Sequence, residues 1–200
     1  MGKYTTFAEL ETLAYQAVHH VDGIHHEPRP TMPDGFAILQ DSGAPSTWLV
    51  EWRKFEMFLD TGIPQWPIFM EDGNGKLPFL AFSTLPKLTC PGAGDCLDWC
   101  YSFKSWRYAG PFFRQLQNTM LLIDPTFDGR HAIARAFKAL PEREFRLYVD
   151  GDFDSLDTMH FWFDLLESRP NMPTYGYSKS WELFLEWDDI GNTFPANYVL

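Results

Sequence analysis

All three cysteines of the 200-residue chain lie in one short stretch, Cys90-Pro-Gly-Ala-Gly-Asp-Cys96-Leu-Asp-Trp-Cys100. Proline and glycine in its first half favour a loop, and we expect a helix from Cys96 onward. Cys96 and Cys100 are four residues apart, which would place both thiols on one face of that helix. Three thiolates gathered in this way predict a metal or iron–sulfur site with one coordination position open.

Other interpretations of the cysteines stay open, including three buried small hydrophobic residues. A disulfide would suit an oxidising compartment, but residues 1–6 do not begin a secretory signal. A structural zinc site would need a distant histidine as fourth ligand. The candidates are His19, His20, His25, His26, His131 and His160. A cubane [4Fe-4S] cluster fits the loop-then-helix layout better, because each of three cysteines can bind a separate iron.

Composition narrows the class of protein. The hydrophobic content of 45% is enough for the core of one domain. The formal charge of -11 and the pI near 4.8 argue against a nucleic-acid partner, since such proteins usually present a basic patch. No apolar run is long enough to cross a bilayer, so we expect no membrane partner. Few cysteines and the predicted thiolate site indicate a reducing, intracellular location.

Hydrophobic periodicity predicts an α/β fold, in which βα units form a mainly parallel sheet. We expect a single domain, with a helical N-terminal part over 1–76 and a core over 77–200 that contains the cysteine loop. Predicted helices cover 6–18, 46–59, 96–108, 111–123, 125–140, 155–168 and 180–188, and predicted strands cover 77–85, 144–150, 172–178 and 197–200.

Polar side chains follow the predicted strands where those strands end. The cysteine loop follows the first strand, Asp150 and Asp152 follow the second, and Lys179 follows Tyr177 after the third. The carboxyl ends of parallel strands meet at one edge, so we expect these groups around one cleft, as polar neighbours of a cofactor. The alternatives are turn formation and helix capping for the aspartates, a solvated charge for Lys179 and a core position for Tyr177.

Three blocks of the chain are distinctive together: Thr89-Cys-Pro-Gly-Ala-Gly-Asp-Cys-Leu-Asp-Trp-Cys-Tyr101, Arg146-Leu-Tyr-Val-Asp-Gly-Asp-Phe153 and Tyr175-Gly-Tyr-Ser-Lys-Ser-Trp181. In this order they resemble the phage-encoded family known only as "gene product eighty-eight". The resemblance covers about residues 77–200. It implies a viral origin, hence the host cytoplasm, and a cluster held by Cys90, Cys96 and Cys100.

The cysteine loop after the first strand of a parallel βα array is also similar to the radical S-adenosylmethionine enzymes. This similarity implies a reduced form of their partial barrel, with S-adenosylmethionine at the open iron. The chain departs from them in its C-x5-C-x3-C spacing, where C-x3-C-x2-C is typical, and in having no Gly-Gly-Glu-like stretch.

Three functions follow from the predicted site. The first is a redox or radical enzyme whose open iron binds a small molecule. The second is a non-enzymatic cluster protein, either an electron carrier for a redox partner or a docking module. The third is a structural zinc protein. The sequence does not name a substrate or an oligomeric state.

Overall fold

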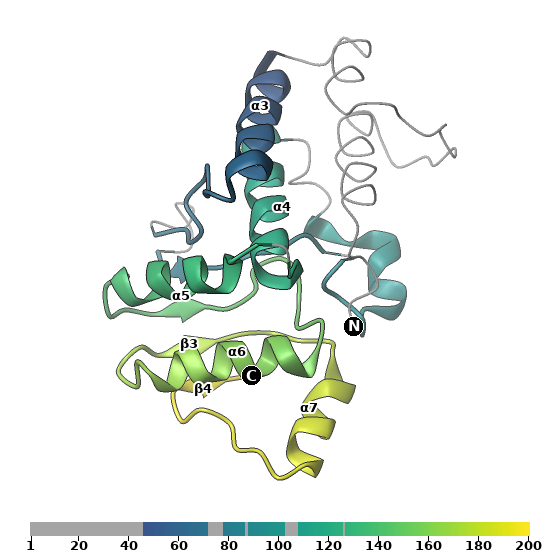
Figure 1. Cartoon of the computed structure of the whole chain (residues 1–200). Helices are drawn as coiled ribbons and strands as arrows, with labels where there is room; N and C mark the ends of the chain where they lie inside the picture. Colours follow the sequence, from purple (N-terminus) through teal and green to yellow (C-terminus); the bar gives the residue numbers. More distant parts are fainter. Residues whose placement is uncertain (1–45, 72–77, 87, 103–107, 126) are drawn as a thin grey trace.

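The computed structural model describes residues 46–71, 78–86, 88–102, 108–125 and 127–200 (Figure 1). The helix predicted over 6–18 and the histidine pairs at 19–20 and 25–26 lie outside the described residues.

Helices and short strands alternate along the described chain, as the sequence predicts for an α/β protein (Figure 1). None of the helices in this part of the chain is long and apolar enough to span a bilayer. The helical elements are α3 (Ser46–Thr61), the 3-10 helix η1 (Gly94–Trp99), α4 (Ala109–Ile123), α5 (Gly129–Ala139), α6 (Leu156–Glu167) and α7 (Trp181–Asp189). The strands are β1 (Leu80–Ala81), β2 (Phe145–Arg146), β3 (Thr174–Tyr175) and β4 (Tyr198–Val199).

The four strands form one sheet in the order β1-β2-β3-β4, and every neighbouring pair is parallel. Helices lie in each connection, because a parallel strand can be reached only by a crossover. Backbone pairing continues beyond the two-residue strands: Phe82 N donates to Arg146 O at 3.1 Å, and Val149 N donates to Phe82 O at 3.0 Å. The predicted parallel α/β fold is therefore confirmed.

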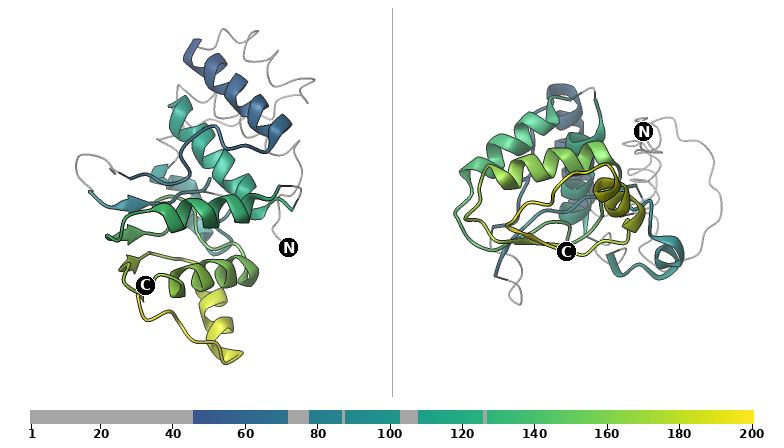
Figure 2. Two further views of the ribbon diagram at one scale, coloured as in Figure 1. Left: turned by 60° about the vertical axis from the view of Figure 1, so that its left-hand side comes forward. Right: turned by 90° about the horizontal axis from the view of Figure 1, so that it is seen from below.

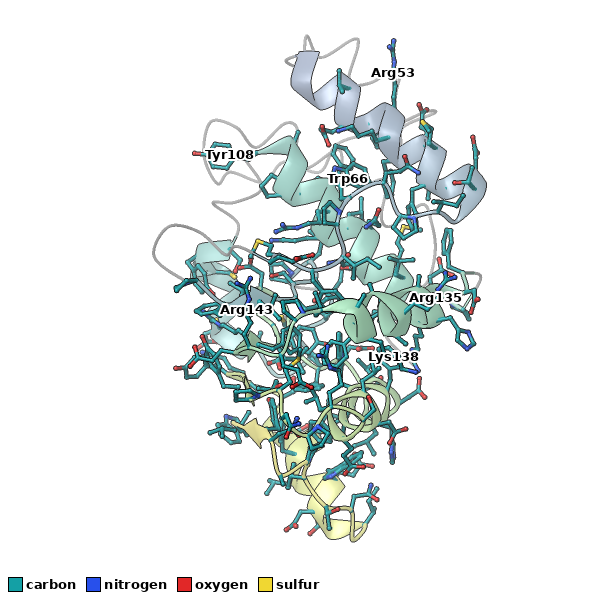
Figure 3. The ribbon with its side chains drawn as sticks, turned by 90° about the vertical axis from the view of Figure 1, so that its left-hand side faces the viewer. Arg53, Trp66, Tyr108, Arg135, Lys138 and Arg143 are labelled. Atoms are coloured by element: carbon teal, nitrogen blue, oxygen red, sulfur yellow. The ribbon has the colours of Figure 1, made fainter. Side chains whose placement is uncertain are left out.

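One face of the sheet is buried under α5 and α6, which lie side by side (Figure 2). Alternate strand residues such as Phe82 and Phe145 point to this face and are fully buried. Trp162 of α6 lies at the centre, with its ring centroid 4.7 Å from that of Phe82. The exposed side of α5 carries Arg135 and Lys138, which point away from the core (Figure 3).

Buried side-chain amides of helix α4 form hydrogen bonds with the backbone segments that precede and follow β1 in sequence. Gln117 Oε1 accepts hydrogen bonds from the backbone N–H groups of Gln65 at 2.6 Å and Trp66 at 3.1 Å. Asn118 Nδ2 donates to Ile68 O at 2.8 Å and to Ser83 O at 3.1 Å. These bonds fix the segments that enter and leave β1, and the second of those segments leads to the cysteine loop.

Over its described residues, the helix predicted over 96–108 is wrong in kind. The structure has the 3-10 helix η1 instead, and Cys100 follows it with φ -57° and ψ 119°, which is not helical. A 3-10 helix has three residues per turn and is stable only in short pieces. Cys96 and Cys100 therefore do not share one face of an α-helix. Residues 103–107 of the predicted helix lie outside the described part of the chain.

The predicted helix start at Asp124-Pro125 is also wrong. Asp124 ends α4, where its backbone N–H donates to Met120 O, and α5 begins at Gly129 after its N-cap Asp128. Proline often follows the end of a helix because it cannot continue one, and Pro125 acts in this way.

Candidate functional site

The three loops at the carboxyl edge of the sheet lie against one another, as the strand order predicts. The hydroxyl groups of Thr84 and Thr89 are 2.8 Å apart, and Asp152 N donates to Thr89 Oγ1 at 3.4 Å. A Cβ atom at Gly92 would lie 2.1 Å from Lys179 O, so the cysteine loop touches the loop after β3. The cysteine loop is thus packed into the place where parallel sheets usually carry their sites.

A second glycine makes this packing close. Gly151 has φ +87°, which favours glycine, and a Cβ there would lie 1.9 Å from Thr84 Oγ1. The loop after β2 can therefore approach β1 only with glycine at this position. Tyr148, three residues before Gly151, also has a positive φ of 60°, and its buried hydroxyl accepts a hydrogen bond from Trp162 Nε1 at 3.0 Å.

The three cysteines are half-buried, and none forms a disulfide. Among the residues that the structure describes, no group of three His, Cys, Asp or Glu side chains is close enough to hold a metal ion. Of the histidines considered for zinc, His131 contacts Asp128 at 2.5 Å and His160 packs on Trp187 with ring centroids 4.4 Å apart. The other four lie outside the described residues.

Asp152 connects the loop after β2 to the loop after β3. Its carboxylate accepts hydrogen bonds from Ser178 Oγ at 2.7 Å, Lys179 N at 2.8 Å and Phe153 N at 2.8 Å. Only 5% of the residue is exposed, and burial raises the pKa of its carboxyl group, while the three hydrogen bonds lower it. Asp152 therefore links the loops after β2 and β3 by hydrogen bonds.

Asp150 connects the loop after β2 to the segment that follows η1. Its carboxylate accepts hydrogen bonds from Ser102 Oγ and from Gln115 Nε2, the latter at 2.9 Å. Burial raises the pKa of Asp150, and the charges of Arg146 and Arg114 act in the opposite direction. Tyr101, beside Cys100, donates its hydroxyl hydrogen to Val149 O at 2.8 Å.

Tyr177 lies on the sheet face opposite α5 and α6 and is 71% exposed. The Arg146 guanidinium lies over its ring, 5.5 Å from the centroid, and Arg146 Nε is buried without a hydrogen-bond partner among the described groups. Tyr175 packs edge-on to Tyr177 with centroids 6.3 Å apart. These residues form a cationic and aromatic surface. Lys179 is exposed and contributes its backbone N–H to Asp152.

Sequence reasoning missed several residues at this edge. Ser102, Gln115 and Arg146 contact predicted residues, and Tyr101 bonds the neighbouring Val149. Of these four, only Gln115 has a signal in the sequence, because it belongs to a mainly polar stretch over 115–119 within an otherwise apolar helix pattern. That run indicates buried amides and hydroxyls, which need hydrogen-bond partners. The partners themselves come from segments distant in sequence.

The fold and the edge define the class of protein: a parallel α/β protein whose cysteine loop lies at the carboxyl ends of the strands. Residues 60–200 match the model of a protein family described as Gene product 88. The chain therefore belongs to this phage gene-product family. No curated protein and no solved structure matches the chain.

Proposed function

We propose that this phage protein holds a [4Fe-4S] cluster through Cys90, Cys96 and Cys100, with one iron open to a small molecule or a redox partner. The observation that supports the proposal is the position of the cysteine loop at the carboxyl edge of a parallel sheet, against the 150–152 and 178–180 loops. Three cysteines as the donor set suit a cluster, because iron–sulfur clusters are held by thiolates.

The cysteine loop has the freedom to bring its thiols together. Gly94 and Asp95 are exposed, and Gly94 has φ +50° with no atom within 4 Å of the position of a Cβ atom. The backbone around Gly94 can therefore adjust at low cost, while the contact of Gly92 with Lys179 and the contact between Thr84 and Thr89 fix the first half of the loop. Glycines also let N–H groups turn towards cluster sulfurs.

The residues around the loop have separate roles in this proposal. When bound, the cluster would supply a one-electron donor and a Lewis-acidic iron. Asp152 is a positioning residue, because its hydrogen bonds lie between two loops. Asp150, Tyr177 and Lys179 are the polar neighbours of the open position, with Arg146 beside Tyr177. S-adenosylmethionine is the cofactor to test first at that position.

The test is iron and sulfide analysis of anaerobically purified protein, with electron paramagnetic resonance of the dithionite-reduced sample. We expect about four irons and four sulfides per chain, as a cubane cluster requires. A signal that changes on addition of S-adenosylmethionine supports the open iron as a cofactor site. An unchanged cubane signal supports an electron carrier or docking module instead, and zinc in place of iron overturns the cluster.

Variants locate the ligands. Cys96→Ala should lose bound iron, whereas Met57→Ala, at an exposed position on α3, should retain it. Circular dichroism of both proteins distinguishes loss of the cluster from loss of the fold. A folded Cys96→Ala protein with full iron content would contradict the three-cysteine assignment.

A further inference from the structure

An apolar groove of about 440 Å³ lies between α7 and the edge strand β4. Its apolar lining comes from α7, from the connection that follows it and from the last residues of the chain. These side chains are Trp181, Phe184, Leu185, Phe194, Tyr198 and Leu200. None of these residues is among those proposed to hold or surround a cluster, although α7 begins directly after the loop that Gly92 contacts.

Large apolar side chains of the groove are exposed to solvent. Trp181 is 59% exposed and Leu185 is 65% exposed. Of the twelve large hydrophobic residues that are exposed in the described chain, six lie within residues 181–200. Contiguous exposed apolar surface of this kind usually marks an interaction site.

The floor of the groove is well packed. The rings of Phe184 and Phe194 stack with an interplanar angle of 11° and centroids 6.0 Å apart. Trp187 donates its indole N–H to Thr193 O at 3.1 Å, which fixes the connection between α7 and β4. The groove is therefore preorganised, and binding of a partner would carry little entropic cost for ordering it.

Acidic side chains surround the groove and favour a partner of opposite charge. The sequence of α7, WELFLEWDD, contains four acidic residues and no basic one. Glu182, Glu186, Asp188 and Asp189 are all exposed, and Asp188 itself lines the groove. A second copy would bring two acidic helices together in a chain of formal charge -11, which opposes self-association.

We propose that this groove binds a peptide segment of a partner protein in which apolar side chains are flanked by lysine or arginine. The apolar anchors fill the groove beside Trp181 and Leu185, and the basic residues meet the acidic side chains of α7. Ser180, the N-cap of α7, directly follows Lys179, whose carbonyl touches Gly92. The partner would thus lie next to the cysteine loop. The inference does not depend on a cluster.

The test uses the full chain and a fluorescein-labelled synthetic peptide with leucine anchors and flanking lysines. A twin peptide carries glutamate in place of every lysine. Fluorescence anisotropy should show binding of the lysine peptide that weakens as salt is raised, and little binding of the glutamate peptide. Leu185→Ala should weaken binding about tenfold, as loss of an anchor worth over 1 kcal/mol predicts. Met57→Ala, also at an exposed position but on α3, should bind like wild type.

Three results would overturn the proposal. Equal binding of the two peptides would remove the charge argument, and equal binding by Leu185→Ala would place the contact elsewhere. Sedimentation that shows a dimer abolished by Leu185→Lys would make a second copy the occupant of the groove. Because Leu185 is exposed, both variants should keep the circular dichroism of the wild type.

Discussion

Gly92 is the residue at which the cysteine loop meets the rest of the site. A methyl group there would meet the backbone of Lys179 and Ser180, which cannot move aside as a flexible side chain could. We predict that Gly92→Ala lowers the free energy of unfolding by about 1–3 kcal/mol, the usual cost of overpacking. Urea denaturation measures this change.

Gly110→Ala is the matched control, because the space around Gly110 is open and it lies within helix α4. The control should be neutral or slightly stabilising, since alanine favours a helix. If both variants unfold at the wild-type urea concentration, the contact between the two loops is not close.

Because Asp150 is buried, the free energy of unfolding should depend on its ionisation and therefore on pH. Burial raises its pKa in the folded protein above the unfolded value of about 4. Its contribution to stability is therefore fully present below that value and is lost as the pH rises through the folded pKa. Asp150→Asn cannot titrate, so we predict that the stability of wild type falls relative to this variant from about pH 4 towards neutrality.

The substitution is conservative in its hydrogen bonds. Gln115 Oε1 is buried without a hydrogen-bond partner among the described groups, so rotation of the Gln115 amide would let it accept from the new amide. Urea denaturation at several pH values measures the difference between the two proteins. A difference that changes in the opposite direction with pH would show that hydrogen bonds and arginine charges outweigh burial at Asp150.

At the scale of the element, α4 acts as a clamp on two neighbouring backbone segments. Asn118 donates to the carbonyl of Ile68, in the segment that pairs with β1 through Met70, and to the carbonyl of Ser83, just after β1. We predict that Asn118→Ala costs about 2–4 kcal/mol, because two buried carbonyls lose their donors. Thermal and urea denaturation measure this loss.

Arg135→Ala on the exposed side of α5 is the control for the clamp, and surface changes of this kind usually stay within about 0.5 kcal/mol. An Asn118→Ala protein as stable as this control would mean that water replaces the amide. That outcome would leave α4 holding the sheet by its apolar side chains alone.

Most elements could be predicted from local pattern. The helix over 155–168 was expected from its apolar period, and α6 begins after Ser155, whose hydroxyl accepts from Thr158 N at 3.2 Å. Such caps depend on residues three positions apart, so sequence carries them. The start of α5 could not be predicted in this way. An Asp-Pro pair such as Asp124-Pro125 is found both at the start of a helix and just after the end of one.

At the scale of the whole molecule, the excess of acidic residues should make stability depend on salt. The chain has 27 acidic and 16 basic residues, and the ion pairs Arg130–Asp157 and His131–Asp128 involve exposed carboxylates. Net charge far from zero destabilises the compact state by self-repulsion. We predict that the thermal midpoint rises by a few degrees between about 0.01 M and 0.2 M sodium chloride, as repulsion is screened.

The double variant Glu182→Gln, Glu186→Gln reduces the net charge by two and should show a smaller response to salt. Both side chains are exposed, so the core is unchanged. Differential scanning calorimetry compares the two proteins. A midpoint that falls with salt in both would show that attractive ion pairs dominate over repulsion.

The class of fold follows from the sequence pattern alone. Alternating helix and strand patterns leave a parallel sheet as the arrangement that crossovers allow, and the position of a loop after a strand decides its edge. The helix and strand patterns are local, and the edge at which a loop lies follows from chain connectivity. Neither requires knowledge of contacts between distant parts of the chain. In the structure the loops that carry the cysteines, Asp152 and Lys179 contact one another, while their role as a binding site stays a prediction.

The contacts that those residues make depend on the tertiary structure. The 3-10 form of η1, the hydrogen bonds of Asp152 and the groove beside α7 depend on groups far apart in the chain. The apolar period of α7 predicts a helix, but it cannot tell which of Trp181, Phe184 and Leu185 becomes covered. That outcome depends on what packs against each side chain, because burial is a property of the neighbours and not of the residue.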